Sequence, residues 1–273
     1  MTDRNWFQIA VLLYGISMIY SVFLWRKGFR EDNRVNYFLL LAAFAGHTVS
    51  LMQRGFSFSR CPVTNLYEAT AFIIWTMVAA YLIIGMWSRF RFLGAFLSPV
   101  LFCVGVFAMM PALDKHHGPN PEFFVPGWQN SLHAALFALA YAAFGLSSGA
   151  GLMYLTQEHD LKFHKARAIF SLLPPIQRLE VVTWRLLLTG FCLLTLALLI
   201  SMSYLKQTQG SYWSNDPKVI WSFLVWAMYL GLMLMRWRLE QGGRKFAWGA
   251  VAGFAFVLLT FWGTNLLSPI HNP

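Results

Sequence analysis

Charged residues are scarce in this chain of 273 residues, because Asp, Glu, Lys and Arg make up 12% of it, against 58% hydrophobic residues. A soluble domain usually carries about 25% charged residues, so the composition excludes both a soluble globular protein and a disordered one. Cysteine is also rare, and Cys61, Cys103 and Cys192 form no C-x-x-C pair, which excludes a thioredoxin-like motif and a zinc ribbon. Cys103 and Cys192 fall within apolar segments, where we expect them to be buried as small hydrophobic side chains.

Long apolar segments are abundant, and eight of them can cross about 30 Å of hydrocarbon as helices. They lie at about residues 6–25, 35–53, 66–87, 92–110, 128–155, 181–205, 219–235 and 246–267. The fifth is longer than a bilayer requires, so we expect it to tilt or to project beyond the membrane. The sequence therefore predicts an all-α polytopic membrane protein with about eight transmembrane helices, in a single domain over residues 1–273.

The formal net charge of +10 gives the orientation of these helices. Alternate connections carry 15 of the 21 Lys and Arg residues on one side of the membrane and six on the other. The six are Arg4, Arg54, Arg60, Lys115, Lys206 and Lys218. Because Lys and Arg accumulate in cytoplasmic connections, both termini are predicted to lie outside. The basic charge is explained by topology, and no basic groove or RNA-binding motif indicates a nucleic-acid partner.

Histidines collect at the predicted outer side. His47 lies in the outer half of the second span, His133 in the first turns of the fifth, and His271 follows the eighth. Aromatic residues at the same level are Trp128, Tyr212 and Trp213. Taken singly, such a histidine is often a hydrogen bond between helices, and such aromatic rings often form the interfacial belt.

Taken together, these residue types suit haem. Two neutral imidazoles can ligate the iron from opposite faces, and indole and phenol rings can cover the porphyrin. Arg54, Arg60 or Lys218 would pair with the propionates. Zinc fits less well, because the outer side lacks the thiolates or clustered carboxylates of a tetrahedral site.

Several motifs occur in an order that resembles the cytochrome c assembly family, which comprises the CcsA/ResC, CcmC and CcmF proteins and the shorter HemX-type relatives. The loop over residues 210–218 (GSYWSNDPK) is similar to the tryptophan-rich motif of that family. Residues 62–68 (PVTNLYE) resemble its P-x-x-N-L-Y-E entry to a helix, and residues 133–144 resemble its H-x7-Y-x2-F helix. Leu173-Pro174-Pro175, and Gly263-Thr264-Asn265-Leu266-Leu267 followed by His271, complete a collinear likeness over residues 40–273.

The resemblance implies a membrane protein that handles non-covalent, b-type haem at its outer face. His133 and His271 match the two histidines that ligate haem iron in the larger members. Tyr212, Trp213 and Asp216 would belong to the haem-facing platform, with Trp128 beside it. His47 matches a histidine of an early span that serves a second haem site in the synthases.

The chain also departs from the pattern. Gln209, Asn215 and Val219 stand where the family often carries Trp, Trp and Glu, and residues 228–234 (MYLGLML) contain no histidine. These departures favour a short, HemX-like member that is no stand-alone enzyme, and at most a component of a cytochrome c haem lyase or synthase.

Two functions remain open at this stage. The first is a haem-binding protein of the bacterial cytoplasmic membrane that presents haem outside to an apocytochrome c or to a second synthase subunit. The alternative is a HemX-like, non-enzymatic regulator of haem biosynthesis that contacts a cytosolic enzyme through its basic inner loops. A small-molecule transporter fits less well, because the spans lack the charged residues that usually mark coupling sites.

Overall fold

The computed structural model describes residues 2–27, 33–58, 65–87, 90–114, 128–162, 174–238 and 242–267. Within these ranges the chain forms eight long α-helices and the short 3-10 helix η2, and no strand. The helices are α1 (Asp3–Arg26), α2 (Arg34–Phe58), α3 (Leu66–Gly85), α4 (Leu93–Ala108), η2 (Pro111–Leu113), α5 (Trp128–Lys162), α7 (Ile176–Gln209), α8 (Pro217–Arg238) and α9 (Arg244–Leu267). Each long helix coincides with one predicted segment, which confirms the all-α fold.

Helix length and composition fit a membrane. Six helices are long and apolar enough to cross one, namely α1, α2, α3, α5, α7 and α8. The apolar helix α4 is shorter, with 16 residues, and α9 has 24 residues. Because every backbone polar group in hydrocarbon must be satisfied internally, this set of helices makes the chain a multi-pass membrane protein. As predicted, α5 exceeds the length of a span, with 35 residues.

Local sequence explains where several helices begin and end. Asn65 caps α3, since its side-chain oxygen accepts a hydrogen bond from the backbone N–H of Glu68 at 2.8 Å. Pro175 precedes α7, which begins at Ile176, five residues before the predicted start. At the other end of α7, Gly210 adopts a left-handed φ of 70°, a conformation that glycine takes without a steric penalty and that commonly terminates helices.

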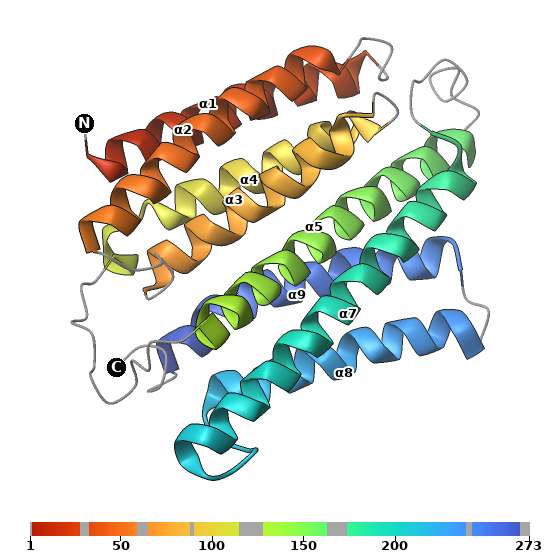
Figure 1. Ribbon diagram of the computed structural model, residues 1–273. Coiled ribbons are helices and arrows are strands. Elements are labelled where there is room, and N and C mark those ends of the chain that lie inside the picture. Colours follow the sequence, from red (N-terminus) through yellow and green to blue (C-terminus); the bar gives the residue numbers. More distant parts are fainter. Residues whose placement is uncertain are drawn as a thin grey trace.

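The helices form two groups of four that meet at α5 (Figure 1). In the first group α1 packs against α2 and α4, and α3 packs against α2 and α4. In the second group α5 packs against α7 and α9, and α8 packs mainly against α9. α5 also contacts α3 and α4, so it joins the two groups and is the most buried of the six membrane-crossing helices.

Ion pairs show that successive helices run in opposite directions. Arg54, near the end of α2, contacts Asp3 at the start of α1, Glu68 at the start of α3 and Asp114 after η2. At the opposite end of the bundle, Arg236 of α8 pairs with Glu180 of α7 at 2.7 Å. We call the end with Arg54 the outer end and the end with Arg236 the inner end, following the predicted orientation. The start of α1 and the end of α9 lie at the outer end (Figure 1).

Candidate functional site

His133 lies on α5 near the outer end, partly buried. Its Nδ1 is 3.1 Å from the backbone oxygen of Ala197 on α7. A carbonyl oxygen only accepts hydrogen bonds, so Nδ1 carries the proton and donates it. The lone pair of the neutral ring is therefore on Nε2, which is the arrangement that metal-binding histidines usually have.

The H-x3-F-x3-Y-x2-F spacing places its four rings on one face of α5. The rings of His133 and Phe137 meet edge to face with centroids 4.6 Å apart, and those of Phe137 and Tyr141 at 6.0 Å. Tyr141 in turn meets Trp221 of α8 at 6.4 Å. The motif thus forms a column of aromatic rings that runs from His133 into the contact between α5 and α8.

Asp216 and Lys218 mark the start of α8. Asp216 is 5% exposed, and its Oδ1 accepts a hydrogen bond from the backbone N–H of Lys218 at 2.8 Å. Asp216 is therefore the N-cap of α8, a structural role that its predicted membership of a haem-facing platform did not include. Tyr141, on the same face of α5 as His133, meets Trp221 near the start of α8. The loop over residues 210–218, called the tryptophan-rich loop below, therefore leads directly into the helix that contacts the aromatic column of His133.

Tyr212 and Trp213 are exposed at the outer end, with 54% and 48% of their surface accessible. The indole N–H of Trp213 donates to Oδ1 of Asn215 at 3.0 Å, and the indole packs on Phe223 with centroids 5.4 Å apart. Its edge is thus held in place while much of the ring faces outward. Asn215, which replaces a tryptophan of the family pattern, is the residue that orients the remaining one.

His47 lies apart from this group. It is 0% exposed, and its Nδ1 is 3.1 Å from the hydroxyl of Tyr14 on α1. The ring of Phe7, also on α1, packs edge to face against it at 5.0 Å. Nε2 of His47 is buried without a hydrogen-bond partner among the described residues. The structure therefore places His47 between α1 and α2 in the first group of helices, whereas His133 contacts α7 in the second.

Two predicted site residues, Trp128 and His271, have side chains outside the described part of the chain. Trp128 is the first residue of α5, but its side chain is outside the described part of the chain. His271 lies outside the described residues altogether, four residues beyond the end of α9. Arg60, one of the cations expected to meet a propionate, is outside them as well.

Arg54 has a different role from the one expected. Its side chain is 4% exposed, with Nε 2.8 Å from Glu68, Nη1 2.9 Å from Asp3, and Nη2 on Asp114. Its guanidinium also lies 4.8 Å from the centre of the Tyr67 ring. All three nitrogens are occupied, so the expectation that Arg54 pairs with a propionate is wrong. We call Arg54, Asp3, Glu68 and Asp114 the Arg54 cluster.

The Arg54 cluster also explains the N-L-Y-E motif. Asn65 caps α3 and donates its amide N–H to Asp114 at 3.0 Å, Tyr67 lies against the guanidinium, and Glu68 binds it. In the sequence Glu68 appeared only as the last residue of the P-x-x-N-L-Y-E motif. The signal in the sequence was the group Asn65, Tyr67 and Glu68 at the start of an apolar span, because a carboxylate there needs a cationic partner such as Arg54.

The middle of α8 packs tightly against α5. Phe144 and Tyr229 are each 1% exposed, and their rings stack with centroids 3.7 Å apart and planes 8° apart. Behind them, a Cβ on Gly190 would lie 2.7 Å from Phe144. These packed rings fill the space beside Tyr229, which belongs to the stretch over residues 228–234 that contains no histidine.

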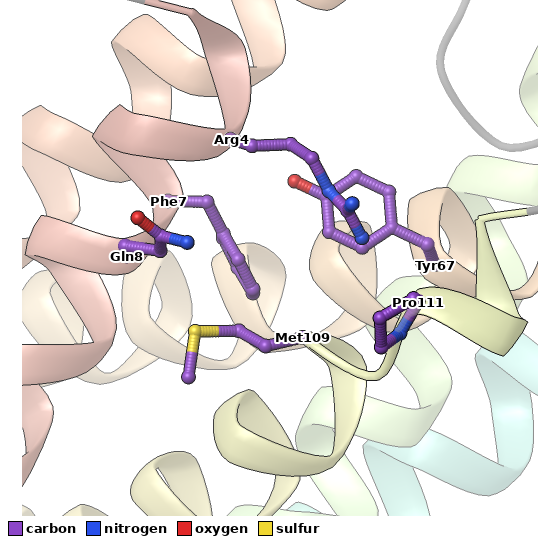
Figure 2. A pocket seen from close by; sticks show the side chains of 6 residues that line it. All are labelled: Arg4, Phe7, Gln8, Tyr67, Met109 and Pro111. Carbon is purple, nitrogen blue, oxygen red and sulfur yellow. The ribbon is translucent and has the colours of Figure 1, made fainter.

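Cys103, Cys192 and one cavity are further candidate features of the structure. Cys103 and Cys192 are exposed on the surface of the bundle, so the expectation that they are buried is wrong. No group of His, Cys, Asp and Glu in the described ranges is arranged to bind a metal ion. A cavity of about 160 Å³ opens at the outer end of the first group of helices (Figure 2). It is lined by Arg4, Phe7, Gln8, Tyr67, Met109 and Pro111, and hence by neither His133 nor the tryptophan-rich loop.

The chain is similar to known proteins of one family. Residues 63–271 match the model of the cytochrome C assembly protein family. The chain is 25% identical to the cytochrome c biogenesis protein CcsA of Pyropia yezoensis, over 95% of this chain and 91% of the relative. It is 26% identical to CcsA of Chlorella vulgaris, over 92% and 90%, and 27% identical to CcsA of a Prochlorococcus marinus strain, over 80% and 76%.

The match begins at α3 and includes His133, the tryptophan-rich loop and His271. The relatives are CcsA proteins covered over about nine tenths of their length, and they give no support to a HemX-like assignment. Since the family model covers more than half of the chain, the protein belongs to the cytochrome c assembly family.

Proposed function

We propose that this chain is a membrane haem-binding protein that holds haem at its outer end and presents it during cytochrome c biogenesis. Membership of the family and the CcsA relatives support the role in cytochrome c biogenesis. The binding of non-covalent, b-type haem is the further step. It is supported by the group of residues around His133.

The observation that carries the proposal is the hydrogen bond from His133 to the backbone of Ala197. It fixes the protonated nitrogen and orients the ring, so Nε2 is available as an axial ligand without a competing tautomer. We assign the second axial position to His271, which follows the outer end of α9 by four residues. Haem bound there would supply the iron that the two imidazoles ligate and the vinyl groups from which thioether bonds to a cytochrome are made.

The outer loop completes the site. Tyr212 and Trp213 offer exposed rings against which a porphyrin face can pack, with Trp128 as a third ring at the start of α5. Asp216 holds the loop in position by capping α8. We assign no part in this site to His47, because its contacts are with α1.

The partner that receives haem would dock at the outer end. We propose an apocytochrome c or a second synthase subunit, since no acid–base pair for thioether chemistry accompanies His133 among the described residues. The chain then contributes positioning and acts at most as a component of a haem lyase. We place it in the bacterial cytoplasmic membrane with both termini outside. The relatives come from algae as well as bacteria.

The alternative, a regulator that acts on a cytosolic enzyme, depends on free positive charge at the inner end. There Arg236 pairs with Glu180 at 2.7 Å, and Lys162 and Arg244 approach Glu158 at 3.0 and 3.7 Å. The chain's own carboxylates take up part of that charge, so the outer site is the better supported function.

The test is the absorption spectrum of the detergent-purified protein titrated with haem. We expect the Soret band of six-coordinate, bis-histidine haem. His133→Ala or His271→Ala should weaken binding or leave a five-coordinate spectrum, because one axial ligand is lost. His159→Ala is the matched control, since His159 is an exposed histidine at the inner end of α5. An unchanged spectrum in the double variant His133→Ala/His271→Ala would contradict the assignment.

A further inference from the structure

Lys206 is a cation at the outer end that is not among the residues assigned above to the proposed haem site. It lies in the last turn of α7, exposed, with its Nζ 4.3 Å from the centre of the Tyr212 ring. It makes no ion pair with a carboxylate in the described ranges. We propose that Lys206 recognises a carboxylate of the ligand that packs on Tyr212, namely a haem propionate; this inference rests on the proposed function.

The other described cations of the outer end are already engaged. Arg54 binds three carboxylates in the Arg54 cluster, and Arg4 approaches Asp114 at 3.3 Å. Lys218 lies in the first turn of α8, where its backbone N–H binds the Asp216 carboxylate and its ammonium is attracted by the same carboxylate. Lys206 differs because its only described contacts are with a ring and with the helix end. A contact between an ammonium and an aromatic ring is weaker than an ion pair, so a carboxylate can take over the ammonium.

The chain holds Lys206 and Tyr212 together through the end of α7. The backbone N–H of Gly210 donates to the backbone oxygen of Lys206 at 3.1 Å, and the left-handed φ of Gly210 turns the chain back. Tyr212 follows two residues later under the ammonium. The side chain of Ser211 then accepts from the backbone N–H of Trp213 at 3.2 Å. The turn at Gly210 therefore brings the backbone of Tyr212 back beside the last turn of α7, within reach of the Lys206 side chain.

Lys206 lies closer to the outer end than the level of His133. Ala197, which accepts the hydrogen bond from His133, lies nine residues earlier on α7. This spacing is about 13 Å along the helix and about two and a half turns around it, so the two residues share an order along α7 and not a face. Toward the outer end of α7, Ala197, the partner of the His133 imidazole, comes first and Lys206 follows in the last turn. A ligand with an apolar, metal-binding body and a carboxylate edge matches this order, with the carboxylates toward water.

The test compares haem with haem dimethyl ester, in which both propionates are blocked. Binding of each to the detergent-purified full chain is followed by absorption. Lys206→Gln should weaken haem binding about tenfold, the loss expected for one hydrogen bond to a charged group, and leave binding of the ester unchanged. Lys206→Arg should retain most of the affinity for haem, because it keeps the charge. Lys162→Gln is the control, because Lys162 is an exposed lysine at the inner end.

The outcomes separate the two proposals. If Lys206→Gln weakens the ester and haem equally, or affects neither, the role of Lys206 in carboxylate recognition is wrong, whereas the proposed haem site stands. If the unaltered protein binds neither compound, the proposed function is wrong, and the inference about Lys206 is overturned with it. Thermal unfolding of each variant checks that the exposed substitutions leave the fold intact.

Discussion

Replacing Arg54 by Met removes the cation of the Arg54 cluster while keeping much of the side-chain volume. Glu68 is 0% exposed and Asp114 is 9% exposed, so at least one carboxylate would remain buried without its partner. Removing one member of a buried ion pair costs about 3–5 kcal/mol. For a chain of this size that loss lowers the melting temperature by roughly 10 °C.

The assay is reversible unfolding in detergent, followed by tryptophan fluorescence during a titration with denaturing detergent and, separately, during heating. Arg238→Met is the matched control, because Arg238 is exposed at the inner end and its one hydrogen-bonding, ionic or ring contact within the described part of the chain is with the ring of Trp237, at 5.1 Å. We expect that control to change the free energy of unfolding by less than about 0.5 kcal/mol.

Two further variants separate charge from geometry. Arg54→Lys keeps the charge but loses the fork that reaches three carboxylates, so its stability should fall between those of the parent and of Arg54→Met. The double variant Arg54→Met/Glu68→Leu removes the buried carboxylate as well and should recover part of the loss. If Arg54→Met unfolds within 0.5 kcal/mol of the parent, the claim that the cluster holds the outer end together is refuted.

Three other predictions concern topology, packing and activity. Reporter fusions after Trp87 and after Arg238 should behave as cytosolic and fusions within residues 211–216 as external; a cytosolic signal from the latter would overturn the orientation. Gly190→Val should destabilise the protein by about 1–3 kcal/mol through overpacking against Phe144, measured by thermal unfolding, with Gly231→Val as a control at a position with open space. The chain alone should not restore cytochrome c maturation in a cell that lacks its synthase, as judged by peroxidase staining of covalent haem after denaturing electrophoresis; covalent holocytochrome would return the synthase function to first place.

The positions of the helices could be predicted because lipid leaves a chain few choices. Backbone groups in hydrocarbon must be satisfied within the segment, so apolar length alone locates a helix. The predicted start of α7 was five residues late for a related reason. Its first turns carry Arg178 and Glu180 and look polar, whereas the boundary is set by Pro175.

The candidate site could be predicted only as a set of residue types at one level. Sequence periodicity gives the depth of a histidine, but it does not give the helix that the histidine faces. His47 and His133 both lie in the outer halves of their helices, yet His47 contacts Tyr14 and His133 contacts Ala197. The role of Arg54 was missed for the same reason, since its partners are up to 60 residues away along the chain and a cation near an interface usually faces water.

The Arg54 cluster imposes an order on membrane insertion. Asp3 precedes Arg54 by 51 residues, Glu68 follows it by 14, and Asp114 follows it by 60. When the hairpin of α1 and α2 has left the ribosome, Arg54 has only Asp3 as a partner, and the other carboxylates arrive with later spans. The hairpin of α1 and α2 should therefore be an intermediate of insertion. Its Arg54 gains the remaining partners when Glu68 arrives with α3 and Asp114 arrives after α4. Truncation after residue 60 would remove Glu68 and Asp114 and leave Arg54 with Asp3 alone. We expect proteases to degrade such a hairpin faster than the full chain.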